Sequence, residues 1–142
     1  MSGDYSSFNR VISYGGAVTA EGEEFIFVDN TGSYLEAADS DDWNFDGEFC
    51  MEFFGLKVTN TTAIAGFLGR WLTTGNQRAY AFDYEGTTPN ALRFLFSTDG
   101  TNTPGPFTDF QVAWAPTPGQ AYDVCVERDA SDVVRVYVDG VM

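Results

Sequence analysis

The chain has 142 residues, about the size of one domain, which is enough to bury a core without metals or disulfides. Acidic residues outnumber basic ones by 21 to 7, there is no histidine, and the net charge is -14. Such a surface repels phosphate backbones and anionic lipid, which argues against nucleic acid and bare membrane as partners. We favour a simpler interpretation of the same charge, a protein that stays soluble in saline surroundings. No segment approaches the roughly 18 consecutive apolar residues of a membrane span, so we expect no membrane insertion.

The first 22 residues are rich in Ser, Gly and Tyr, and RVISY (10–14) is their only strand-like run. They have neither the basic start nor the apolar run of a secretory signal peptide. We expect residues 1–22 to form an N-terminal arm or an extra edge strand, and residues 23–142 to form a single domain.

Apolar residues in that domain recur with a period of two, as in β-strands, and no segment of helical length repeats every 3.6 residues. In EFCMEFF (48–54), for example, Phe49, Met51 and Phe53 share one face of a predicted strand. About nine such runs, separated by Gly-, Pro-, Asn- and Asp-rich turns, predict an all-β, two-sheet antiparallel sandwich. The other clear runs are EFIFVD (24–29), RAYAFDY (78–84), ALRFLFS (91–97), DVCVE (123–127) and VRVYVD (134–139).

Two long segments resemble laminin-G-like domains, which have the concanavalin A-like jelly-roll fold. They are FIFVDNTGSYLEAADSDDWNFDGEFCMEFFGL (25–56) and GQAYDVCVERDASDVVRVYVDG (119–140), the latter ending in a Tyr-Val-Asp-Gly hairpin. The resemblance implies a jelly-roll sandwich, a binding function and a place outside the cell or on a particle surface. Family members continue past this hairpin, so residues 23–142 are expected to be a sandwich truncated there. An uncovered edge strand would favour self-association.

A carbohydrate site needs flat rings that stack on sugar CH groups, together with polar groups that hold the hydroxyls. Such residues gather around one predicted hairpin, and they are Arg70, Trp71, Asn76, Gln77, Arg78 and Tyr80. We therefore expect a noncatalytic, lectin-like binding module, within a larger surface or particle protein. Two alternatives stay open: the aromatic residues serve only as core, or the chain is a structural or assembly domain of a phage or virion protein.

A third interpretation is an enzyme that hydrolyses β-glucan. Glucanases of this superfamily carry Glu-x-Asp-x-Glu on one strand, and this chain has Glu48 and Glu52 in matching positions. However, Cys50 replaces the central Asp, and four strand residues separate the two glutamates by about 13 Å along the backbone. A retaining pair needs carboxyl groups roughly 5 to 5.5 Å apart. The sequence therefore favours a noncatalytic domain.

Many relatives of these domains hold calcium with loop carboxylates. An acidic loop here supplies hard oxygen ligands, so calcium is a candidate cofactor and a solvated loop is the alternative. The candidate ligands are Asp39, Asp41, Asp42 and Asp46.

The chain has two cysteines, Cys50 and Cys125. Pentraxins, which belong to the same broad group, join cysteines on the two corresponding strands, so the resemblance implies a disulfide. Free thiols are the alternative, because Cys50 falls about two residues early and that offset is roughly 7 Å along a strand.

Overall fold

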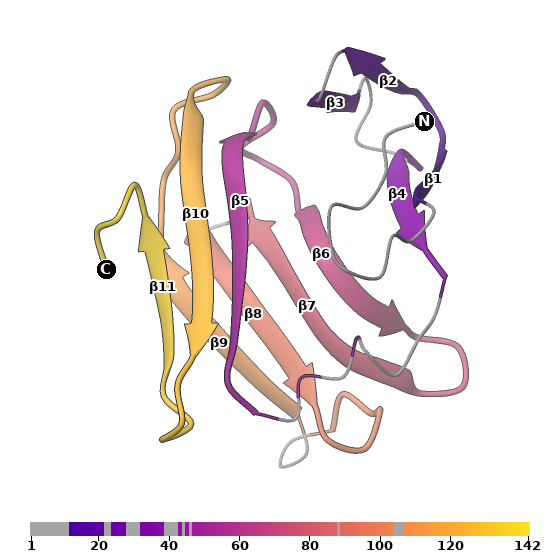
Figure 1. The fold of residues 1–142 in the computed structure, drawn as a ribbon, viewed down its shortest axis with the longest axis vertical. Helices are drawn as coiled ribbons and strands as arrows, with labels where there is room; N and C mark the ends of the chain where they lie inside the picture. The colour runs from indigo at the N-terminus through magenta and orange to yellow at the C-terminus, as the bar shows by residue number, and fades with distance from the viewer. Residues whose placement is uncertain are drawn as a thin grey trace. The chain divides into compact units, whose positions relative to one another are not determined.

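The computed structural model describes residues 12–21, 24–27, 32–38, 43, 45, 47–87, 89–103 and 107–142. They belong to two compact units, Met1–Trp43 and Asn44–Met142. All described strand pairs are antiparallel, and the described strands of the second unit form two sheets, of three and four strands (Figure 1). The predicted all-β, two-sheet antiparallel sandwich is confirmed. The described part of the chain has no helix with the length and apolarity needed to cross a bilayer.

The described residues of the first unit form two strand pairs. Strand β1 (Ile12–Gly15) pairs with β4 (Tyr34–Ala37), and β2 (Val18–Glu21) pairs with β3 (Glu24–Phe27). β1 overlaps the strand-like run at residues 10–14, and β3 overlaps the run at 24–29. The boundary between the units follows Trp43, whereas the sequence suggested an arm ending at residue 22.

The four-stranded sheet of the second unit is a meander, in which each strand pairs with the next along the chain. Its strands are β6 (Ala65–Leu72), β7 (Gln77–Glu85), β8 (Ala91–Ser97) and β9 (Phe107–Ala113), in the order β6-β7-β8-β9. Short polar connections rich in Gly, Thr, Asn and Asp join them, as the turn signals in the sequence predicted.

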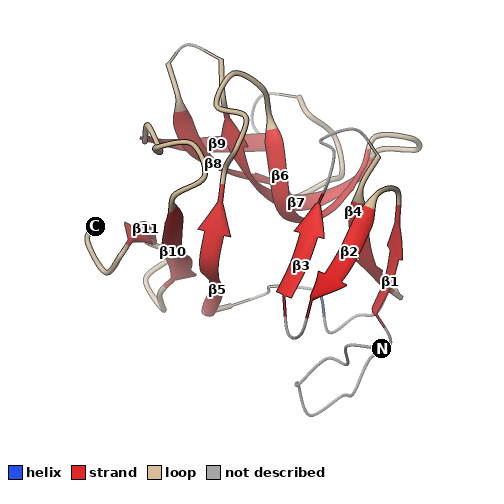
Figure 2. Ribbon diagram, turned by 90° about the horizontal axis from the view of Figure 1, so that it is seen from above, coloured by secondary structure: helices blue, strands red, loops and turns tan. Residues whose placement is uncertain are grey.

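The three-stranded sheet brings together segments that are far apart in the sequence. Its strands are β5 (Phe49–Lys57), β10 (Ala121–Arg128) and β11 (Val134–Val138), in the order β11-β10-β5. Seen from above in Figure 2, these strands form one layer and β6 to β9 form the other. The whole meander therefore lies, in sequence, between the paired strands β5 and β10.

The core fills the space between these two layers, and the period-two pattern explains its membership. Phe82 of β7 and Val126 of β10 have no exposed surface. Alternate residues on each strand face the same interior, as a pleated strand requires. The main cluster of buried core residues consists of Met51, Tyr80, Phe82, Leu92, Phe94, Val124, Val126 and Val136.

A β-bulge interrupts the pairing of β5 with β10. The register shifts between Tyr122 and Val124, and Gly55 on the opposite strand has a φ of +66°. The N–H group of Gly55 donates to the Asp123 carboxylate at 2.9 Å. A glycine tolerates this left-handed backbone, and the carboxylate satisfies an amide that the ladder leaves unpaired.

The β11 strand ends in the predicted Asp-Gly turn. Asp139 and Gly140 both have positive φ, and Val138 and Val141 exchange two backbone hydrogen bonds of 2.9 Å across the turn. Positive φ at both central residues is the signature of a type I′ hairpin turn. Among the described strands, β11 has one neighbour, β10, so its other side is an edge.

Candidate functional site

Two connections meet at one end of the four-stranded sheet. The backbone N–H of Arg78, in β7, donates to the carbonyl of Gly100, which lies between β8 and β9 (3.4 Å). The Arg78 guanidinium donates to the same carbonyl (3.3 Å) and to the side-chain carbonyl of Asn76 (3.1 Å). A Cβ atom at Gly100 would lie 1.8 Å from the Asn76 carbonyl oxygen, so only glycine permits this approach. The two connections thus hold each other in place.

Trp71, near the end of β6, completes this group. Its ring centroid lies 6.0 Å from that of Phe107, the first residue of β9, and 5.8 Å from Cζ of Arg78. A guanidinium at this distance from an indole makes a favourable cation–π contact. Trp71 and Phe107 are half-buried, whereas Asn76 and Gln77 are exposed. We call Trp71, Asn76, Arg78 and Phe107 the aromatic end.

The structure brings together some of the residues expected to bind ligand and separates others. Arg78 contacts both Trp71 and Asn76, and Gln77 lies between Asn76 and Arg78 in the chain. Tyr80, in contrast, is 6% exposed and packs against Phe45 with ring centroids 4.5 Å apart. Burial raises the pKa of the Tyr80 phenol, partly offset by the positive charge of Arg70. The Tyr80 ring is therefore part of the core.

Arg70 is half-buried on β6, directly across from Tyr80. The β6–β7 register shifts immediately after this pair, because Trp71 faces Arg78 and Ala79 has no partner on β6. The shift explains how Trp71 departs from the simple alternation of the strand. Sequence reasoning missed Phe107, which directly follows Thr-Pro-Gly-Pro in the sequence and begins β9.

The two candidate catalytic glutamates lie on or beside β5. Glu48 is exposed immediately before the strand, and Glu52 is exposed in its middle. Glu52 faces Cys125 of β10 rather than a second carboxylate. Because β5 is extended between the two residues, their backbones are about 13 Å apart.

The four aspartates proposed for calcium, Asp39, Asp41, Asp42 and Asp46, lie outside the described residues. Calcium at that loop stays a prediction.

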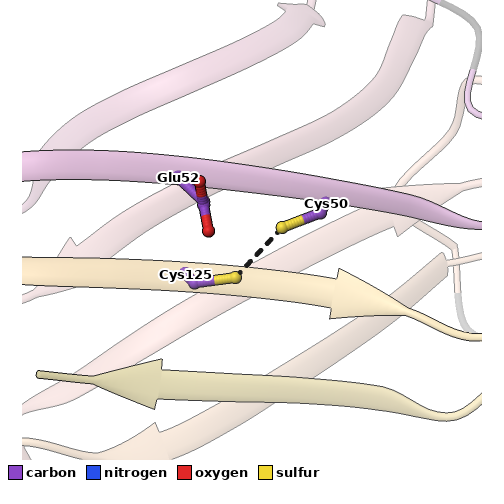
Figure 3. A group of neighbouring side chains, drawn as sticks. All are labelled: Cys50, Glu52 and Cys125. Carbon is purple, nitrogen blue, oxygen red and sulfur yellow. Dashed lines mark hydrogen bonds between the residues drawn. The ribbon is translucent and has the colours of Figure 1, made fainter. Parts of the chain in front are cut away.

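Cys50 and Cys125 face outward on the three-stranded sheet, from β5 and β10 (Figure 3). They occupy diagonal positions, because Cys125 pairs with Glu52 and Cys50 pairs with Glu127. Their Sγ atoms are 3.2 Å apart, and both residues are free thiols here. Burial is the main cause that raises the pKa of Cys125 to about 12, and the neighbouring thiol and carboxylates add to it. The two-residue offset in the sequence therefore does not separate the sulfurs, and the disulfide stays a prediction.

The two thiols line an open depression of about 280 Å³ on this face. Besides the cysteines, its lining includes Glu52, Phe54, Asp123, Glu127 and Tyr137. The outer face of the three-stranded sheet thus combines thiols, carboxylates and one phenol.

The ion pairs of the two sheets differ in how far they are exposed to water. On the four-stranded sheet, Arg93 donates to both oxygens of Asp83 (2.9 and 3.0 Å) and lies 2.9 Å from Glu85. Hydrogen bonds from Thr87 are the main cause that lowers the pKa of Glu85. The Asp83 side chain is only 9% exposed, so this pair is largely removed from water.

On the three-stranded sheet, Arg135 lies 2.7 Å from Asp129 and 3.6 Å from Glu127. Its hydrogen bond is the main cause that lowers the pKa of Asp129, and the N–H groups of Val133 and Ser131 add to it. The side chain of Asp129 is 34% exposed, so water screens this pair far more.

Comparison of the chain with protein-family models, curated proteins and solved structures found no match. The laminin-G-like resemblance therefore rests on the two segments quoted above.

Proposed function

We propose that this chain is a noncatalytic binding module for carbohydrate, and that the aromatic end is its binding site. The observation that carries the proposal is the half-buried Trp71 ring, which contacts Phe107 and Arg78. Arg78 in turn donates to the side-chain carbonyl of Asn76, and both Asn76 and Gln77 are exposed.

The chemistry of this group suits a sugar. An indole offers a flat apolar surface for the CH groups of a pyranose ring, and amides both donate to and accept from hydroxyls. Arg78 is partly engaged by Asn76 and Gly100, which would fix its orientation before a ligand arrives. A net charge of -14 repels sulfated or sialylated chains, so we expect a neutral glycan.

The resemblance to laminin-G-like domains also supports this proposal, because many of those domains are binding modules. Tyr80 is left out of the proposed site, since its ring is buried against Phe45.

A glycan array followed by calorimetric titration of the best neutral glycan tests the proposal. We expect Trp71→Ala to weaken binding at least tenfold, because stacking on the indole is lost. Phe54→Ala is the matched control, because Phe54 is an aromatic residue that is 77% exposed on the other sheet. Binding to no glycan, or equal losses in both variants at unchanged folding, would contradict the proposal.

A second candidate is a structural or assembly domain of a larger surface or particle protein. The observation that favours it is the edge of β11, flanked by exposed apolar residues, of which Val133 is 44% and Val141 71% exposed. Strand edges of this kind pair readily with another chain. Concentration-dependent mass by light scattering, in a chain that binds no glycan, would favour this candidate.

A further inference from the structure

We infer that Cys50, Glu52 and Cys125 form a binding site for one thiophilic divalent cation, of which zinc is the type, on the outer face of the three-stranded sheet. This site is separate from the aromatic end and does not depend on the carbohydrate proposal.

The ligand atoms are already gathered. The two Sγ atoms and a Glu52 carboxylate oxygen all lie within 4.8 Å of one another. Figure 3 shows the Glu52 side chain extending from β5 toward β10, on the side where the two sulfurs meet. Three donors therefore converge on one point from two hydrogen-bonded strands.

The spacing of the sulfurs suits a metal after a small adjustment. Two thiolates of a tetrahedral zinc site, with Zn–S bonds of about 2.3 Å, lie about 3.8 Å apart. The observed separation is 3.2 Å, so a small rotation of the side chains is sufficient. An S–S bond of about 2.05 Å requires the sulfurs to move closer instead. The metal-bound and disulfide-bonded states thus exclude each other.

The donor set selects the class of ion. Two thiolates and one carboxylate suit zinc and similar metals, whereas calcium and magnesium prefer oxygen ligands alone. Three protein ligands leave the fourth tetrahedral position open, and the depression above the thiols gives water or an added ligand access to it.

A second carboxylate, that of Glu127, lies near the proposed site but is not assigned as a ligand. Glu127 lies directly across from Cys50, but its carboxylate accepts a hydrogen bond from the Tyr137 hydroxyl at 2.8 Å and lies 3.6 Å from Arg135. Both contacts involve the same oxygen of Glu127, Oε1. Glu52 is the carboxylate assigned to the metal, because its oxygen lies within 4.8 Å of both sulfurs.

The test is a titration of the fully reduced, metal-free chain with Co²⁺ under anaerobic conditions. We expect one equivalent to produce a thiolate-to-cobalt charge-transfer band and the visible bands of tetrahedral Co²⁺. Added Zn²⁺ should bleach both, and Ca²⁺ should not. Cys50→Ser and Cys125→Ser should each reduce the charge-transfer intensity by about half or more.

Glu52→Gln should weaken Co²⁺ binding at least tenfold, since loss of a mere outer hydrogen-bond partner already costs 10–100-fold at metal sites. Glu48→Gln is the matched control, because Glu48 is an exposed glutamate beside the same strand. Circular dichroism would verify that each variant folds.

Three results would overturn the inference. One is a reduced wild-type chain with two titratable thiols and no charge-transfer band. Another is equal weakening by Glu48→Gln and Glu52→Gln. The third is a pair that resists reduction in the folded protein, which would identify it as a structural disulfide.

Discussion

The two sheets of the second unit differ in how they are connected and in what their outer faces carry. The four-stranded meander joins neighbours through short turns, and its ion pair, Asp83 with Arg93, is nearly buried. The three-stranded sheet joins distant segments, and it carries the outward-facing thiols and the more exposed pair of Arg135 with Asp129. The two sheets therefore use charged residues differently. The ion pair of the meander is shielded from water and stabilises the sheet, whereas the polar groups of the three-stranded sheet are more exposed and remain accessible to ligands.

The largest effect should come from truncating an aromatic residue in the meander. Phe82 has no exposed surface and contacts the rings of Phe53 and Phe67, so Phe82→Ala should lower the free energy of unfolding by about 3–5 kcal/mol. Phe54, on the outer face of β5, is 77% exposed, so Phe54→Ala should change the free energy of unfolding by no more than about 0.5 kcal/mol. Urea unfolding measures both. A loss above 2 kcal/mol in Phe54→Ala would show that something covers that face.

The ion pairs test the same contrast between the two sheets. Arg93→Met leaves the nearly buried Asp83 carboxylate without its partner, and breaking such pairs costs about 3–5 kcal/mol. Arg135→Met removes a partner from a carboxylate that water screens, so its loss of stability should be much smaller. A double-mutant cycle of Arg93→Met with Asp83→Asn isolates the buried interaction. Equal losses of stability in Arg93→Met and Arg135→Met would contradict the contrast between the sheets.

The smallest effect concerns acid titration. The pKa of Asp129 is lowered in the folded state, so its contribution to stability is present above the unfolded pKa of about 3.9 and is lost as the pH falls through the folded pKa. Arg135→Met should raise the pKa of Asp129, since Arg135 is the main cause of the shift. Arg93→Met should move the pKa of Glu85 less, because hydrogen bonds from Thr87 dominate there. Carboxyl ¹³C titration by NMR measures both changes in pKa. A larger change at Glu85 than at Asp129 would contradict this expectation.

Alternation in the sequence was sufficient to predict most strands and their inner faces. Phe49, Met51 and Phe53 point inward and Cys50 and Glu52 outward, as EFCMEFF indicated, because a pleated strand fixes this period. The Asp139–Gly140 turn was equally accessible, since a type I′ turn requires positive φ at both positions. In RAYAFDY, the same alternation grouped Tyr80 with Phe82, and both are in the core.

The aromatic end and the thiol pair depend on features without a local signal. A register shift beside Arg70 sets the position of Trp71, and its neighbour Phe107 comes from a strand that is not adjacent in the sheet. The proximity of Cys50 to Cys125 follows from the register of β5 against β10, which depends on packing over the whole sandwich. Strand register is set by such tertiary contacts, so residue type alone did not predict it.

The position of the meander between β5 and β10 has a consequence for the order in which the chain folds. Cys50 and Cys125 are 75 residues apart, so their contact closes a long loop, whereas the turns of the meander close short ones. Long closures lose more chain entropy and form more slowly. We therefore expect β6 to β9 to assemble first and β5 to join β10 late. Contact between the two thiols would then report the last stage of folding.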